Sequence, residues 1–226
     1  MKALVFNGAK AGDIETLLKE HGFELVTENP DIVVSYGGDG TLMRAEQAFP
    51  GIPKLPLRGS MICKLCHALP NEDVVKSITE GKYTTEEYWK LEVRAKGNTI
   101  VGMNDITVHN ADPRHAIRYE LFINEKNIGH KIIGDGVVVA TPFGSTGYYR
   151  SITDSYFELG IGIAFNNSTE QSDHVVVKEN SVVRIVVARG PAIVYVDNRE
   201  ERIALEEGNE VLIRKSDKVA KILRVV

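Results

Sequence analysis

A glycine-rich turn carries the side chain with the clearest chemical potential in this sequence. Residues 37–41 read Gly-Gly-Asp-Gly-Thr and lie between a continuous β-branched run at 31–36 and a helical pattern. Glycines can adopt positive φ and let the backbone approach a ligand, and the N–H groups at a helix N-terminus favour a bound diphosphate. A carboxylate repels phosphates, so Asp39 fits here if it accepts a proton from an attacking hydroxyl or acts through Mg²⁺. The alternative is a plain tight turn in which Asp39 only caps the helix.

Two later segments carry groups suited to a nucleotide. Residues 102–105 read Gly-Met-Asn-Asp, and Gly-Asp-Gly at 134–136 leads through a valine run into Thr-Pro-Phe-Gly-Ser-Thr-Gly-Tyr at 141–148. An asparagine both donates and accepts hydrogen bonds, so Asn104 can read an adenine edge, and the Asp105 carboxylate can accept from ribose hydroxyls. Tyr148 supplies an aromatic face and a hydroxyl, which suits packing on a base.

The elements that hold the glycine turn alternate between strand and helix. Short apolar runs predict strands at 3–6, 23–26 and 31–36, and helical spacing predicts helices at 14–22, 41–48 and 71–81. Thr41 and Asn71 are the expected N-caps of the second and third helices. This alternation predicts a small α/β domain over residues 1–88.

The pattern changes after residue 88. Apolar and polar residues alternate or form short runs, which predicts strands at 91–95, 117–123, 137–140, 182–187 and 193–196. No helical period is recognised between residues 91 and 205. We therefore expect a β-rich, sandwich-type domain over 89–209. Further strands at 211–213 and 219–226 are predicted, and this 210–226 segment could return to the first domain.

Composition excludes several classes of protein. The 226-residue chain has a net charge of −4, and its Lys and Arg residues are scattered, so nonspecific nucleic-acid binding is not expected. The first apolar run, at 3–6, is too short for a signal-peptide core or a membrane span. A cytoplasmic protein without membrane or nucleic-acid partners is expected.

In their order and spacing, the three motifs resemble those of the NAD kinase family. The resemblance covers roughly residues 36–151 and continues weakly at 196–198. It implies an α/β N-terminal domain and an all-β, sandwich-like C-terminal domain. It also implies transfer of the ATP γ-phosphoryl (or one from polyphosphate) to the adenosine-ribose 2′-hydroxyl of NAD, which makes NADP. Mg²⁺ or another divalent cation would assist, and a homodimer or homotetramer would form.

The resemblance also assigns roles to single residues. Asp39 would be the general base, Gly40 would lie near the ribose and phosphates, and Asp135 would lie near the nicotinamide end. Asn104 and Asp105 would hold the ribose hydroxyls or the adenine. The substrate-binding residues implied in full are Gly38, Gly40, Thr41, Asn104, Asp105, Asp135, Thr146, Gly147, Tyr148, Ser151 and Asn198. No protein ligand set for a metal is predicted.

The sequence departs from the family pattern at three places. Family members carry an Asn-x-Gly-x-x-Gly-Phe loop after the first motif, whereas residues 57–64 here read Leu-Arg-Gly-Ser-Met-Ile-Cys-Lys and lack the aromatic side chain. Phe143 replaces a small or polar residue, and Ile-Thr-Asp at 152–154 replaces a glycine pair. The phosphate turn is intact, so a divergent NAD kinase, a preference for another nucleotide and a loss of activity all stay open.

Cys63, Cys66 and His67 form a C-x-x-C-H pattern with several interpretations. Haem attachment requires export, a structural zinc site requires more ligands, and thioredoxin-like chemistry requires a cysteine pair that opens a helix. A reducing compartment also argues against a disulfide. We interpret the cysteines as buried or incidental, with a metal at His67 as the weaker alternative.

Two other functions compete with NAD phosphorylation. A diacylglycerol-type lipid kinase shares the first motif, but its Gly-Thr-x-Asn-Asp segment is absent from this sequence. A nucleotide-binding regulatory protein that has lost turnover would explain the missing loop aromatic. Retention of Asp39 favours an enzyme.

Overall fold

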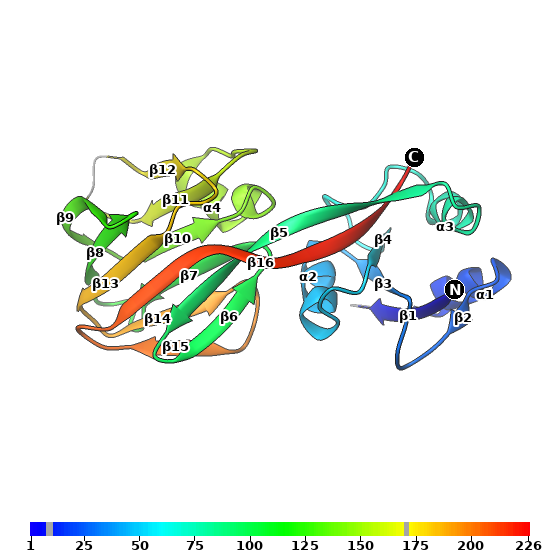
Figure 1. The fold of residues 1–226 in the computed structure, drawn as a ribbon, viewed down its shortest axis with the longest axis horizontal. Coiled ribbons are helices and arrows are strands. Elements are labelled where there is room, and N and C mark those ends of the chain that lie inside the picture. The colour runs from blue at the N-terminus through cyan, green and yellow to red at the C-terminus, as the bar shows by residue number, and fades with distance from the viewer. Residues whose placement is uncertain (8–10, 170–171) are drawn as a thin grey trace. The chain divides into compact units, whose positions relative to one another are not determined.

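The computed structural model describes residues 1–7, 11–169 and 172–226 and divides into two compact units. Unit 1 comprises Met1–Tyr88 with Val219–Val226, and unit 2 comprises Trp89–Lys218. Figure 1 shows two long strands, β5 (Tyr83–Ala95) and β16 (Glu210–Val225), running side by side, and each contributes residues to both units.

Unit 1 is a parallel sheet with helices on both faces. Its strands follow the order β2-β1-β3-β4 and then the C-terminal part of β16, with bounds β1 (Lys2–Asn7), β2 (Glu24–Leu25), β3 (Ile32–Gly37) and β4 (Lys54–Arg58). Its helices are α1 (Gly12–Glu20), α2 (Asp39–Ala48) and α3 (Asn71–Thr79). Because both faces are covered, β3 is a continuous apolar run rather than an alternating one.

Successive β3 residues point to opposite faces, which assigns each helix to a side. Ile32 and Val34 pack in one cluster with residues of α1 and α3, such as Leu18 and Ile78. Val33 packs in another cluster with Ala45 of α2 and with Leu4, Phe6, Phe49 and Ile52. Helix α2 therefore lies on the opposite face from α1 and α3, and only Gly38 separates its first residue from the end of β3.

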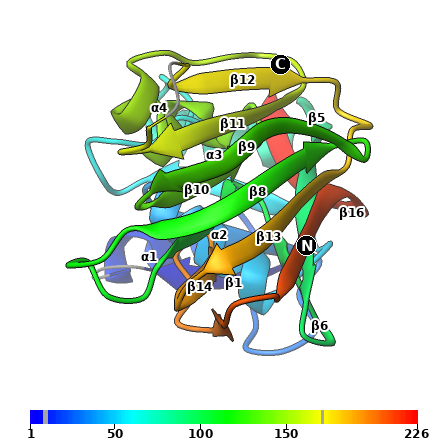
Figure 2. The same cartoon turned by 90° about the vertical axis from the view of Figure 1, so that its left-hand side faces the viewer.

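Unit 2 is a sandwich of two largely antiparallel sheets. The first contains β6 (Asn98–Gly102), β8 (Ile117–Ile123), β9 (Lys126–Gly134) and β13 (Val183–Arg189) together with β5 and β16. The second has the order β12-β11-β10-β7-β14-β15, with bounds β7 (Asp105–Asn110), β10 (Gly136–Ala140), β11 (Ile161–Asn166), β12 (His174–Val177), β14 (Ala192–Val196) and β15 (Arg202–Leu205). Figure 2 shows β8, β9 and β13 of the first sheet from the side.

Alternation along each strand builds the core between the two sheets of unit 2. Val137 and Val139 of β10 point inward and pack with residues of the first sheet such as Tyr119 and Ile185. Val138 and Ala140 point outward and are covered by a short helix, α4 (Tyr148–Thr153), which follows the 3₁₀ turn η1 (Gly144–Thr146). The predicted fold class, an α/β domain followed by a β-sandwich domain, is confirmed.

Two predictions about elements were wrong. Helix α4 lies in the region where no helix was expected, because its six residues are too few for a 3.6-residue period to be recognised. The terminal strands predicted at 211–213 and 219–226 are one strand of 16 residues, β16. The polar stretch between them reads as a break in the sequence, yet Ser216 within it is buried in the structure.

Candidate functional site

The Asp39 turn, residues 37–41, joins the end of β3 to the start of α2. Gly38 is the N-cap, with an extended backbone (φ −123°, ψ −166°), and its carbonyl accepts the N–H groups of Thr41 at 3.0 Å and Leu42 at 3.1 Å. The helix therefore begins at Asp39. The prediction that Thr41 is the N-cap was wrong: Thr41 is the third helical residue and is buried.

The glycines of this turn provide space rather than unusual dihedral angles. Neither Gly37, Gly38 nor Gly40 is among the positive-φ glycines of the described residues, so that part of the prediction was wrong. A Cβ at Gly37 would lie 2.3 Å from Thr41 Oγ1, and one at Gly38 would lie 2.4 Å from the Ile62 carbonyl oxygen. Glycine is required because the helix and the following loop pack directly on the turn.

Asp39 is held by a backbone group of that loop. Its Oδ1 accepts the N–H of Lys64 at 2.8 Å. Lys64 lies between Cys63 and Cys66, which form a disulfide with their Cα atoms 5.3 Å apart. Both cysteines are buried, as one of the two expectations held, but they are not incidental, because the turn at 63–66 brings their side chains within bonding range. The altered loop thus reaches the candidate base through its backbone.

The loop that carries Lys64 is anchored at both ends within unit 1. Asn71 bonds to the peptide of Arg58 through both amide atoms at 2.9 Å, and the Gly59 N–H donates to the Gly37 carbonyl at 3.1 Å. The expected N-cap role of Asn71 was wrong: Pro70 is the N-cap of α3, and Asn71 bonds back to β4 instead. These bonds fix the loop over the Asp39 turn.

His67 ties the same loop to the C-terminal strand. Its Nε2 accepts the N–H of Val225 at 3.0 Å, and Arg224 donates to the Leu65 carbonyl. Burial, and then the charge of Arg224, lower the pKa of His67, while Glu86 opposes them. Within the described residues, no group of three or more His, Cys, Asp and Glu side chains could hold a metal ion. His67 accordingly has a structural partner.

In unit 2, Asp197 organises the segment that carries Asn104 and Asp105. Its carboxylate accepts three consecutive backbone N–H groups, from Met103 (2.9 Å), Asn104 (2.7 Å) and Asp105 (3.2 Å). Burial raises the pKa of the Asp197 carboxyl, and these three hydrogen bonds oppose the rise. Sequence reasoning named the neighbouring, exposed Asn198 and missed Asp197. The sequence signal that could have identified Asp197 is a carboxylate that directly follows a predicted strand and begins a turn.

The second motif packs directly on the third. The Asn104 side-chain amide donates to the Asp105 carboxylate at 2.5 Å, and the Asn104 carbonyl accepts the N–H of Thr141 at 3.0 Å. A Cβ at Gly144 would lie 2.0 Å from the Asn104 carbonyl oxygen, and one at Gly147 would lie 3.3 Å from Asn104 Nδ2. These two glycines let the turn before α4 lie against Asn104.

A pocket of about 470 Å³ opens beside this turn. It is lined by Thr146, Gly147, Arg150, Ser151, Ile152 and Asp154, which include three residues predicted from the sequence. Thr146 Oγ1 is buried without a hydrogen-bond partner in the structure. Arg150 adds a positive charge that the sequence analysis did not single out. The pocket lining therefore carries one cation, Arg150, and one anion, Asp154.

Asp135 directly precedes β10, at the end opposite to the one where Ala140 pairs with Asp105, and Tyr148 begins α4. The side-chain amides of Asn110 (3.2 Å) and Asn167 (3.0 Å) donate to the two carboxylate oxygens of Asp135. Burial, and then the charges of Asp135 and Asp105, raise the pKa of Tyr148. Tyr148 thus interacts with carboxylates from both ends of β10, and we call Asn104, Asp105, Asp135 and Tyr148 the unit 2 site.

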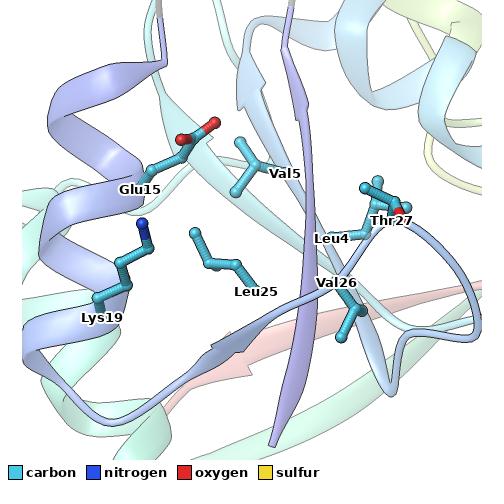
Figure 3. Close-up of a pocket in the computed structure, with 7 residues that line it drawn as sticks. All are labelled: Leu4, Val5, Glu15, Lys19, Leu25, Val26 and Thr27. Carbon is cyan, nitrogen blue, oxygen red and sulfur yellow. The ribbon is translucent and has the colours of Figure 1, made fainter.

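A second pocket, in unit 1, is lined by none of the predicted site residues. Its volume is about 470 Å³, and it is lined by Leu4, Val5, Glu15, Lys19, Leu25, Val26 and Thr27. Figure 3 shows Glu15 and Lys19 extending from α1 toward Val5 of β1 and Leu25 of β2. The lining is mainly aliphatic, and its two charges are of opposite sign, so it is not suited to a phosphate.

Comparisons with known proteins agree with this architecture. Residues 103–225 match the family model for the ATP-NAD kinase C-terminal domain. The NAD kinase of Saccharolobus solfataricus is 31% identical over 93% of this chain and 86% of its own. A crystal structure of an Archaeoglobus fulgidus NAD kinase in complex with ATP has a TM-score of 0.83 at 24% identity, covering 100% of this chain and 94% of that one. Yeast NADH kinase complexed with NADH has a TM-score of 0.85 at 16% identity, covering 100% and 84%.

A parallel α/β unit with a glycine turn before a helix, followed by a β-sandwich with an Asn-Asp pair, defines a class of nucleotide kinases. The chain belongs to the NAD kinase family. The family resemblance expected from the three motifs is confirmed. Within the described residues, no helix is long and apolar enough to cross a membrane.

Proposed function

We propose that this protein is an NAD kinase that transfers the γ-phosphoryl of ATP to the 2′-hydroxyl of the adenosine ribose of NAD. A bond forms between the 2′-oxygen and the γ-phosphorus, the bond from that phosphorus to the β,γ-bridging oxygen breaks, and ADP leaves. The proton of the 2′-hydroxyl passes to a base. Family membership supports the reaction, and the observation that carries the assignment of the base is Asp39 at the first position of α2.

Asp39 has the fixed geometry that a general base requires. The Lys64 N–H occupies Oδ1 at 2.8 Å, so Oδ2 is the oxygen proposed to accept the proton. A ribose hydroxyl is a weak acid, so the proton is expected to move late, as the new O–P bond forms. Gly38, Gly40 and Thr41 would form the backbone that accommodates the phosphates at the helix N-terminus.

The unit 2 site supplies the groups proposed to bind the dinucleotide. The Asn104 amide and the Asp105 carboxylate are suited to adenine and ribose hydroxyls, and Asp135 to the nicotinamide end. Tyr148 offers a ring and a hydroxyl, while Thr146, Gly147 and Ser151 line the adjacent pocket. Asn198, which follows Asp197, is proposed as a further contact of the dinucleotide.

Mg²⁺ is proposed as the cation that accompanies ATP. Magnesium ions commonly keep several waters and bind one or two carboxylates plus substrate phosphates, so a ready-made cluster of protein ligands is not required. No protein ligand is assigned to the cation, because Asp39 is proposed as the base. When bound, the cation neutralises charge on the transferring phosphoryl group. The expected homodimer or homotetramer stays a prediction.

A direct assay for NADP formation tests the proposed function. The purified protein is incubated with ATP, Mg²⁺ and either NAD, NADH or a diacylglycerol in vesicles, and each phosphorylated product is measured separately. Phosphorylation of NAD or NADH, dependent on both ATP and Mg²⁺, is the expected result. Phosphorylation of the diacylglycerol alone would identify a lipid kinase, and nucleotide binding without any product would identify a regulatory protein.

A further inference from the structure

Three neighbouring strands bring His109 and Asn166 together across a glycine. In the second sheet of unit 2, Gly136 of β10 pairs with His109 of β7 on one side and with Asn166 of β11 on the other. Residues directly opposite one another in antiparallel strands share a face. Strands are spaced about 4.8 Å apart, so the backbones of β7 and β11 lie about 10 Å apart.

The side chains of the two residues that flank Gly136 meet. Asn166 Nδ2 lies 3.3 Å from His109 Nε2, although the two residues are 57 positions apart in the sequence. Gly136 also has φ +151°, and a Cβ there would lie 2.0 Å from the Val108 carbonyl oxygen. Glycine is therefore required at this position by the close approach of the β7 backbone, and the His109–Asn166 contact spans it.

The backbone around His109 fixes the direction of this contact. His109 Nδ1 lies 3.1 Å from the Asn110 carbonyl oxygen, which can only accept, so Nδ1 carries the hydrogen. In the neutral imidazole, Nε2 is then an acceptor, and it receives an N–H from the Asn166 amide. This orients the amide, with its nitrogen toward His109.

The second hydrogen of the same amide nitrogen reaches Tyr148. Asn166 Nδ2 donates to the Tyr148 hydroxyl oxygen at 2.9 Å. Tyr148 comes from α4, whose next residue, Tyr149, packs on Val138 and Ala140 of the same sheet face and fixes the helix there. With its oxygen accepting from Asn166, the hydroxyl directs its own proton away from that amide, toward an acceptor other than Asn166.

We propose that His109 and Asn166 are positioning residues that orient the Tyr148 hydroxyl as a donor to a hydrogen-bond acceptor atom of the dinucleotide. This inference rests on the proposed function, in which Tyr148 contacts that substrate. Burial, and then the charges of Asp135 and Asp105, raise the pKa of Tyr148, which keeps the phenol protonated and able to donate. His109 and Asn166 act on the substrate only through Tyr148.

A double-mutant cycle between Asn166 and Tyr148 tests the proposal. Asn166→Leu and Tyr148→Phe are each expected to raise KM for NAD about fivefold, the loss of roughly one hydrogen bond, with kcat and KM for ATP unchanged. In the Tyr148→Phe background, Asn166→Leu should add no further effect, because its partner is already gone. An equal effect of Asn166→Leu in both backgrounds would mean that it acts independently of Tyr148 and would overturn the proposal.

His109 provides the second arm. His109→Leu removes the acceptor and should reproduce the rise in KM for NAD, whereas His109→Gln keeps an acceptor and should retain affinity closer to the wild type. His21→Leu is the matched control, because His21 follows α1 in unit 1 and bonds only locally, to the Leu17 carbonyl, in the interactions of the described residues. Identical kinetics for His109→Leu and the wild type would contradict a positioning role.

A readout that needs no turnover separates this inference from the proposed function. The Tyr148 phenol can be titrated by NMR of ring-labelled tyrosine and assigned by its loss in Tyr148→Phe. Asn166→Leu should raise the phenol pKa further, because the ionised oxygen loses a donor. A shifted phenol pKa in a protein that forms no NADP would contradict the proposed function and leave the hydrogen-bond chain intact. An unshifted phenol pKa would overturn the hydrogen-bond chain.

Discussion

The Asp39 turn of unit 1 and the unit 2 site are built in different ways. The turn is formed by five consecutive residues with a backbone cap at Gly38, and the loop that packs on it, at 59–66, contacts it from at most 25 positions away. The unit 2 site depends on contacts between distant positions, such as Asp197 with residues 103–105, separated by 92 to 94 positions. Local backbone fit therefore governs one site, and long-range polar networks govern the other.

Removing the Asp197 carboxylate should have the largest effect on this contrast. In Asp197→Ala, three backbone N–H groups at Met103, Asn104 and Asp105 lose their acceptor, so unit 2 should lose about 3 kcal/mol or more of stability. KM for NAD should rise as the Asn104–Asp105 segment loosens. Thermal unfolding and steady-state kinetics measure the two effects.

Two controls sharpen that result. Asp197→Asn keeps one acceptor oxygen and should fall between the wild type and alanine. Glu200→Ala, at an exposed position just after this turn, should leave stability almost unchanged. Equal loss for Asp197→Ala and Glu200→Ala would show that the turn as a whole, rather than the carboxylate, supports the segment.

A single methyl group tests the local fit of the Asp39 turn. Gly38→Ala places a Cβ 2.4 Å from the Ile62 carbonyl, and backbone cannot move aside cheaply, so about 1–3 kcal/mol of stability should be lost in unit 1. Gly12→Ala is the matched control, since a Cβ there meets nothing within 4 Å. Hydrogen exchange of unit 1 amides distinguishes them, and wild-type protection in Gly38→Ala would contradict the packing account.

Opening the disulfide should have a smaller effect on the same unit. The Cys63–Cys66 disulfide closes a short loop, so by restricting the unfolded chain it contributes at most about 2 kcal/mol to the free energy of unfolding. The double variant Cys63→Ser with Cys66→Ser should be less stable by up to that amount and should lose order at Lys64, the donor to Asp39. Reduction of the wild type with a dithiol should give the same change, whereas the variant should not respond to the dithiol.

The smallest expected effect is a pH dependence confined to unit 1. Burial and Arg224 lower the pKa of His67 below 6.5, so the unfolded chain binds more protons than the folded one between these two pKa values. The stabilising contribution is therefore complete above pH 6.5 and is lost as the pH drops toward the lowered pKa. The slope of the free energy of unfolding against pH corresponds to less than one proton per molecule. His67→Gln should flatten this slope in a series of chemical denaturation curves, and an unaltered slope would assign it to another group.

The same contrast explains what the sequence could predict. The glycine turn after strand 31–36 and the change to a β-rich second half are local patterns, and both were recognised. Asp197, His109 and Asn166 were missed because their partners lie far along the chain, and local periodicity carries no information on such pairing. The disulfide and the start of α2 at Asp39 were missed because they depend on how the loop at 59–66 packs.

The most direct test of the account is the rate of NADP formation by Asp39→Asn. Asparagine keeps an oxygen that can accept the Lys64 N–H but cannot take the ribose proton. Turnover should fall about 10²–10⁴-fold with NAD and ATP still bound, while Asp13→Asn, in the first turn of α1, should behave as the wild type. Turnover by Asp39→Asn close to the wild-type rate would contradict the assignment of Asp39 as the base.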